Sequence, residues 1–182
     1  MGSHGLREFD RLMLGSVAER VLRRAGCPVL TVRKPAHHVT SPVHDPEPVH
    51  LSKMLLCADF SDPAHHASKY AFSMAKEYGA ELTVLHVLEE IPRSKDIQGA
   101  TAEMTKQLEE YIAVETHNGC NIKVMVRGGK PYHEITQSAL EAQIDLVITG
   151  VRGRGSLHTA LFGSTTHRVI QLGSSPVLAV HI

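Results

Sequence analysis

The sequence lacks three features, each of which would indicate a class of protein. Nineteen Lys and Arg balance nineteen Asp and Glu, so no basic surplus is available for the phosphate backbone of a nucleic acid. The three cysteines form no CxxC pair, which favours free thiols in a reducing compartment over a disulfide scaffold. No apolar run approaches the roughly 18 residues of a membrane helix, and no signal peptide is visible. We therefore expect a cytoplasmic protein that binds neither nucleic acid nor a membrane.

One spacing of small residues occurs twice in the chain. The copies are Gly2-Ser3-His4-Gly5, nine residues and Gly15-Ser16, and Gly150-Val151-Arg152-Gly153, nine residues and Gly163-Ser164. Each copy is followed by an amphipathic stretch and a short apolar strand led by Cys-Pro or Ser-Pro. Two matches at one spacing indicate an internal repeat. Glycines and a helix start also expose backbone N–H groups, which suits the binding of a phosphate.

The two copies divide the chain. The second copy completes a unit of about one domain, whereas the first stands at the N-terminal end of the sequence. We interpret residues 1–33 as the last part of one domain and residues 53–182 as all of a second. Between them, residues 34–52 are rich in Pro and His and show no helical or strand period, which predicts an extended linker.

Apolar strands alternate with amphipathic helices in residues 53–182, which predicts an α/β fold with a parallel sheet and helices on both faces. The expected strands are 54–58, 82–87, 122–126, 145–149 and 177–181. Four helices are expected. The first has Asp62 as its N-cap, the second carries Met104 and Leu108, and the third and fourth begin at Pro131 and Ser164. On the first helix, the pattern places Tyr70, Ala71, Met74 and Tyr78 on one face.

The N-terminal segment is expected to form an appendage of one helix and one strand. A helix from Ser16 to about Ala25 would open with a capping box of Ser16 and Glu19. A strand at 28–32 would pair antiparallel with 177–181, in the same chain or in a partner chain, because a lone apolar edge strand tends to be covered. A homodimer through 177–181, through 28–32 or through both follows from that expectation.

Four motifs in order now identify a resemblance. They are a first strand ending in Asp, Leu55-Leu56-Cys57-Ala58-Asp59-Phe60-Ser61; a second strand reading Leu85-His86-Val87; the helix entry Gly129-Lys130-Pro131; and the second glycine pattern with its Pro-Val-Leu strand. With these motifs, residues 53–182 resemble a universal stress protein domain, and residues 1–33 resemble the last third of another. One departure is Cys57, where the family usually has Pro.

The resemblance implies a Rossmann-like sheet of strand order 3-2-1-4-5, with ligands at the carboxyl ends of strands 1 and 4. It also implies an adenine nucleotide, namely ATP with or without Mg²⁺, with Asp59 at the adenosine end and the backbone of Val87 at adenine. Glycines and hydroxyls of the second motif would hold ribose and phosphates, and we add two arginines for their charge. The candidate nucleotide-binding residues are Asp59, Val87, Gly150, Arg152, Gly153, Arg154, Gly163, Ser164 and Thr165.

These residues predict a regulatory ATP-binding protein of the stress response with little or no hydrolysis. No general base is evident at the crevice, and neither a catalytic nor a metal-binding residue is assigned. One alternative is a dimerising scaffold without a ligand. Another is an enzyme that cleaves at the α-phosphate, although the HIGH and Ser-Gly-Gly-x-Asp-Ser motifs of such enzymes do not occur here. We expect His86 to lie under a neighbouring side chain and Cys57 to be a buried, inert thiol.

Overall fold

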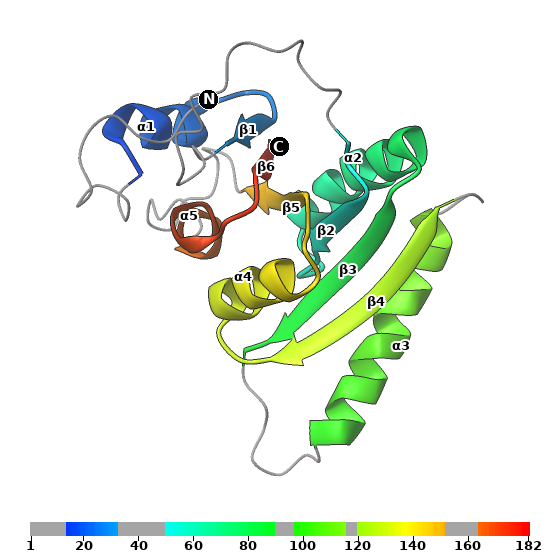
Figure 1. Cartoon of the computed structure of the whole chain (residues 1–182). Helices are drawn as coiled ribbons and strands as arrows, with labels where there is room; N and C mark the ends of the chain where they lie inside the picture. Colours follow the sequence, from blue (N-terminus) through cyan, green and yellow to red (C-terminus); the bar gives the residue numbers. More distant parts are fainter. Residues whose placement is uncertain (1–13, 33–49, 90–96, 116–119, 152–163) are drawn as a thin grey trace.

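The computed structural model describes residues 14–32, 50–89, 97–115, 120–151 and 164–182. They form one six-stranded sheet with helices on both faces (Figure 1). In chain order the elements are α1 (Ser16–Arg24), β1 (Val29–Thr31), β2 (Lys53–Cys57), α2 (Asp62–Tyr78), β3 (Glu81–Leu88), α3 (Ile97–Glu115), β4 (Asn121–Gly128), α4 (Pro131–Glu141), β5 (Leu146–Val151), α5 (Ser164–Leu172) and β6 (Val177–His181).

The sheet order is β1-β6-β5-β2-β3-β4. Its last five strands are parallel and confirm the expected order 3-2-1-4-5. The chain runs outward in one direction from β2 to β3 and β4, and in the other direction through β5 to β6. The order therefore reverses between β2 and β5, which lie side by side in the middle of the sheet.

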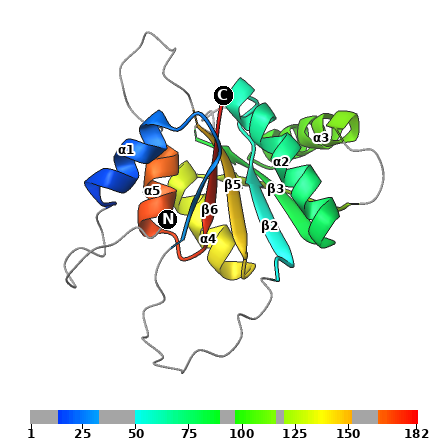
Figure 2. The ribbon, with the colours of Figure 1, turned by 90° about the horizontal axis from the view of Figure 1, so that it is seen from above.

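The helices form two layers. Helices α2 and α3 cover one face of the sheet, and α1, α4 and α5 cover the other, as Figure 2 shows. The α2–α3 face buries Ala67, Phe72 and Leu108. The opposite face buries Leu22 of α1 together with Val169 of α5. Strands β2, β3 and β5 in the middle of the sheet are therefore covered on both sides, which explains their apolar runs in the sequence.

Helix α2 differs from its expected form at its start and on its buried face. Its N-cap is Ser61 rather than Asp62, since the Ser61 side chain accepts a hydrogen bond from the Ala64 backbone N–H. Of the face predicted from the pattern, Ala71 is fully buried, whereas Tyr70 and Tyr78 are 37% and 51% exposed. The buried face consists of small residues, namely Ala64, Ala67, Ser68, Ala71 and Ala75 with Phe72. Small side chains let α2 lie close to the sheet.

The capping box expected for α1 is absent. Gly15 is the N-cap and makes no side-chain capping bond, so Ser16 lies one position inside the helix and out of register for the box. Glu19 instead pairs with Arg23 one turn later, at 2.7 Å. The helix itself has the predicted place in the sequence.

The N-terminal helix and strand are built into the same core. Strand β1 pairs antiparallel with β6 of its own chain, with Val29 opposite Ala179, as the pattern predicts. On α1, the backbone carbonyl of Leu22 accepts a hydrogen bond from Nε2 of buried His181, at 2.6 Å. Strand β6 therefore has a strand on each side, and a dimer through 177–181 would require β1 to leave. The homodimer stays a prediction.

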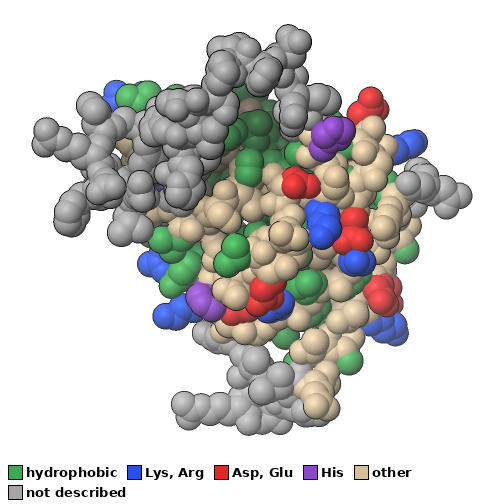
Figure 3. Space-filling view, viewed as in Figure 1, with side chains coloured by type: hydrophobic (Ala, Val, Ile, Leu, Met, Phe, Trp, Pro, Cys, Tyr) green, Lys and Arg blue, Asp and Glu red, His purple; other side chains and the backbone are tan. Residues whose placement is uncertain are grey.

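On the face shown in Figure 3, positive and negative side chains are interspersed. Among the described residues, Arg127 pairs with Glu141 at 2.6 Å and Lys123 with Glu81 at 2.8 Å. Separately, no helix in the part of the chain that the structure describes is both long and apolar enough to cross a membrane.

Replacing Leu22 tests whether α1 belongs to the core. Leu22→Ala should lower the free energy of unfolding by about 2–5 kcal/mol, because Leu22 is fully buried and its removal leaves a cavity. The measurement is chemical denaturation. The matched control is Leu140→Ala on α4, where a 62% exposed leucine should change stability by less than about 0.5 kcal/mol. Equal losses in both variants would show that α1 does not contribute to the core.

Candidate functional site

A cavity lies at the reversal of strand order, at the carboxyl ends of the parallel strands. This position is where open α/β sheets bind their ligands. The cavity measures about 110 Å³. Its lining residues come from β2 and the loop after it, β3, α2, α4, β5 and α5: Cys57, Ala58, Asp59, Ala64, Leu85, Val87, Glu89, Pro131, Ile135, Gly150 and Thr165.

Asp59 follows β2 and has an exposed side chain that is held by its own loop. Its Oδ1 accepts hydrogen bonds from the Ser61 backbone N–H, at 3.0 Å, and from the Ser61 hydroxyl. Phe60, between them, has φ 59°, a left-handed conformation that bulky residues rarely adopt. Such a conformation costs of the order of 1–3 kcal/mol. The turn that presents Asp59 is therefore maintained by contacts elsewhere.

Gly150 is required by packing. A Cβ atom at this position would lie 2.3 Å from the backbone carbon and oxygen of Pro63, and 2.6 Å from the nitrogen of Ala64. These atoms belong to the first turn of α2, so β5 ends in direct contact with that turn. The contact brings the loop of Asp59 and the end of β5 to the same cavity.

The start of α5 is tied to β5 as well. Oγ1 of Thr149 and Oγ1 of Thr166 are 3.3 Å apart, and both side chains are buried. The backbone N–H groups of the first turn of a helix have no partner within the helix and carry the positive end of its dipole. Thr165, in this first turn, lines the cavity.

Four of the predicted site residues line the same cavity, namely Asp59, Val87, Gly150 and Thr165. Ser164 is the first residue of α5. The other four predicted residues, Arg152, Gly153, Arg154 and Gly163, lie outside the described residues.

Glu89 was missed by the sequence analysis. It directly follows β3, whose residues Leu85 and Val87 line the same cavity at an interval of two. That interval was the available signal, because Val87 had already been assigned to the site. Glu89 adds a second carboxylate to the cavity of Asp59.

Cys57 lines the base of the cavity with an uncharged thiol. Burial raises the pKa of Cys57 to about 12, and the negative charge of Asp59 acts in the same direction. The thiolate, which is the reactive form, is therefore scarce at neutral pH. The expectation of an inert thiol agrees with this environment.

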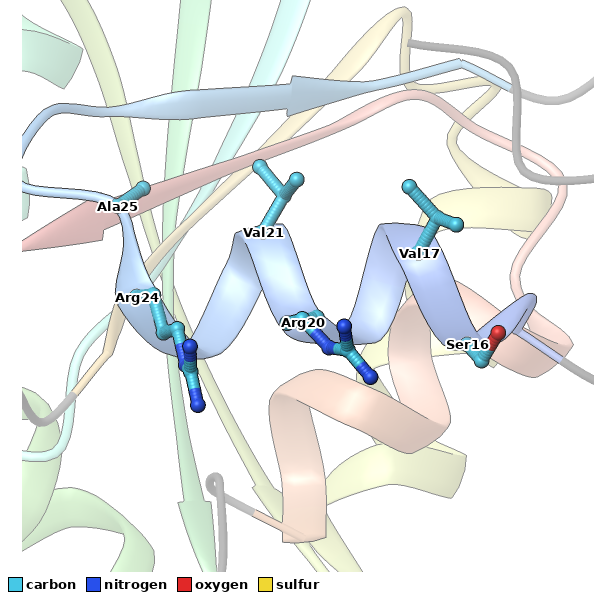
Figure 4. Close-up of a pocket in the computed structure, with 6 residues that line it drawn as sticks. All are labelled: Ser16, Val17, Arg20, Val21, Arg24 and Ala25. Carbon is cyan, nitrogen blue, oxygen red and sulfur yellow. The ribbon is translucent and has the colours of Figure 1, made fainter.

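A second hollow, of about 420 Å³, runs along α1. Figure 4 shows Val17, Val21 and Ala25 on one side of the helix and Arg20 and Arg24 on the other. Its described lining, which Ser16 completes, comes from this one helix and includes no carboxylate or thiol. The cavity of Asp59 is therefore the better candidate, although it is smaller.

The chain belongs to the universal stress protein family, whose model matches residues 1–33 and 50–181. The universal stress protein YxiE of Bacillus subtilis is 32% identical over 146 residues, which cover 71% of this chain and 99% of the relative. The universal stress protein Rv2005c of Mycobacterium tuberculosis is 29% identical over 98% of this chain, which spans only 59% of that relative.

Solved structures give the same fold. A universal stress protein from Archaeoglobus fulgidus aligns with a TM-score of 0.72 and 31% identity, over 100% of this chain and 60% of that one. A universal stress protein solved in complex with cAMP aligns with a TM-score of 0.58 over 73% of this chain and 99% of that one. At 16% identity, the second likeness concerns the fold alone.

Gly150→Ala should lower the free energy of unfolding by about 1–3 kcal/mol or more, because the new methyl group would overlap the backbone of α2. Thermal or chemical unfolding measures this loss. The control is Gly26→Ala, where a Cβ atom would meet nothing within 4 Å and stability should stay within about 0.5 kcal/mol of native. A Gly150→Ala protein as stable as native would contradict the close contact of β5 with α2.

The thiols should differ in reactivity. At pH 7.5, iodoacetamide should label exposed Cys27 much faster than Cys57. The pKa of Cys57 is raised to about 12, so very little of its thiol is in the reactive thiolate form at this pH. Peptide mapping by mass spectrometry follows each site over time in the native protein. Labelling of Cys57 at the rate of Cys27 would show that its thiol is neither buried nor held protonated.

Proposed function

We propose that this protein binds ATP in the cavity of Asp59 and acts in the cytoplasm as a regulatory module of the stress response. The observation that supports this most is the convergence of Asp59, Val87, Gly150 and Thr165 on one cavity from four separate segments. The family resemblance implied a nucleotide role for these residues, and in the fold they lie at the switch point of the sheet. A universal stress protein of the same fold was solved with cAMP, another adenine nucleotide.

The charged groups around the cavity suit one orientation of bound ATP. Asp59 and Glu89 place two carboxylates at the ends of β2 and β3, where a triphosphate would be repelled. On the opposite side lies the first turn of α5, whose N–H groups favour an anion. Adenosine would therefore lie over β2 and β3, with the triphosphate directed toward α5. Arg152, Gly153, Arg154, Gly163 and Ser164 would complete the phosphate end, with Mg²⁺ as a possible companion of the nucleotide.

Little or no hydrolysis follows from this orientation. A general base for water would have to lie beside the γ-phosphate. The carboxylates that line the cavity lie at the opposite end in the proposed pose, and Oδ1 of Asp59 already accepts two hydrogen bonds from Ser61. Binding would then act through conformation or partner contacts rather than through turnover.

The proposed organisation keeps residues 1–33 as part of one universal stress domain, 34–52 as a linker and 53–182 as a second domain. The first part adds a helix and a strand beside β6, and we infer that it supplies no nucleotide site of its own in this chain. A homodimer would use the strand at 28–32, since β6 is already paired on both sides.

Calorimetry with ATP and Mg²⁺ tests the proposed site. Native protein should bind ATP, and Asp59→Ala should weaken binding by about tenfold, because a charged acceptor for the nucleoside is lost. Gly153→Val should abolish binding if the glycine motif lets its backbone approach the phosphates. Glu77→Gln, at an exposed position on α2, is the matched control and should bind as the native protein does.

No binding of any adenine nucleotide by the native protein would contradict the proposal and favour the dimerising scaffold. Release of pyrophosphate during the titration would favour the α-phosphate-cleaving enzyme instead.

A further inference from the structure

The backbone on either side of Asp59 is held by one histidine. Ala58, before it, accepts a hydrogen bond at its carbonyl oxygen from Nδ1 of His86, at 2.7 Å. Phe60, after it, packs its ring against the His86 ring, with centroids 5.2 Å apart and planes tilted by 45°. The expectation that His86 lies under a neighbouring side chain is confirmed, and that neighbour is Phe60.

A tyrosine from α3 also packs against the ring of Phe60. The ring of Tyr111 meets Phe60 edge to face, with centroids 5.8 Å apart. The Tyr111 hydroxyl donates to Oγ of Ser68 on α2, at 3.1 Å, and Ser68 is completely buried. We name Phe60, His86 and Tyr111 the aromatic clamp. It joins the loop after β2 to β3 and α3.

The aromatic clamp lies outside the cavity lining, whereas Asp59 is part of it. The clamp packs with the α2–α3 layer, since Ala58 and Tyr111 belong to the cluster of that face. Cys57, Val87 and Ile135, which line the cavity, belong to the cluster of the opposite face. Ala58 and Asp59, just after the end of β2, both line the cavity, and the aromatic clamp contacts Ala58 and includes the residue that follows Asp59.

We propose that the aromatic clamp positions Asp59 for the adenosine end of the ligand. The left-handed φ of 59° at Phe60 turns the chain between Asp59 and the start of α2, and it is unfavourable for a phenylalanine unless the ring is held. His86 and Tyr111 supply that hold, and His86 also fixes Ala58. This inference rests on the proposed nucleotide site, and it makes Phe60 and His86 positioning residues that act through Asp59.

A double-mutant cycle on ATP affinity tests the inference. The four proteins are native, Phe60→Gly, Asp59→Ala and the double variant. Glycine suits the left-handed backbone, so Phe60→Gly removes the ring without adding strain and should fold. We expect Phe60→Gly to weaken ATP binding about five- to tenfold in the native background and less than about twofold in the Asp59→Ala background. A purely structural role would not produce this dependence on Asp59.

Two further variants sharpen the test. His86→Leu removes the donor to Ala58 and should weaken binding as Phe60→Gly does, whereas His86→Asn retains an N–H donor and should recover part of the affinity. Tyr78→Ala is the control, because it removes an aromatic ring that is 51% exposed at the far end of α2. It should leave ATP affinity unchanged.

The outcomes separate the two proposals. If the native protein binds ATP but Phe60→Gly binds as tightly, or loses the same factor in both backgrounds, the role of the aromatic clamp is overturned and the nucleotide site stands. If the native protein binds no adenine nucleotide, the proposed function fails, and the clamp inference fails with it.

Discussion

Strand β5 ends directly against the first turn of helix α2, and Gly150 is the residue at the contact. Its missing side chain lets the backbone of Pro63 approach to a distance that no Cβ atom would tolerate. The contact places the end of β5 beside the loop of Asp59, at the point where the strand order reverses. The cavity exists because these two segments meet there. Gly150, which belongs to the glycine motif, is thus required for the packing of β5 against α2.

Much of the fold could be predicted from the sequence because most of its strands, β2, β3, β5 and β6, are largely buried. Such strands are short apolar runs, and the runs at 54–58 and 177–181 correspond closely to β2 and β6. Helix details were less accessible. Ser61 and Asp62 are both good capping residues, and only the backbone of the turn decides between them. The buried face of α2 was misassigned because alanines carry a weaker hydrophobic signal than tyrosines, although only the alanines fit beside the sheet.

The site shows a similar division. Asp59, Val87, Gly150 and Thr165 were assigned from the motifs and the family resemblance that they carry, and they line one cavity. Glu89 was missed because two acidic residues in a row after a strand, Glu89 and Glu90, usually indicate a solvated loop. The roles of Phe60 and His86 depend on the left-handed turn and on ring contacts between distant segments, which no local pattern encodes.

The direct test of the nucleotide site is a titration of the labelled native protein with ATP, followed by backbone amide chemical shifts. The largest shifts should occur at Asp59, Val87, Gly150 and Thr165, which lie at the carboxyl ends of the parallel strands. Smaller changes should reach Phe60 and His86. Shifts confined to α1, or no shifts at millimolar ATP, would contradict a nucleotide site in this cavity.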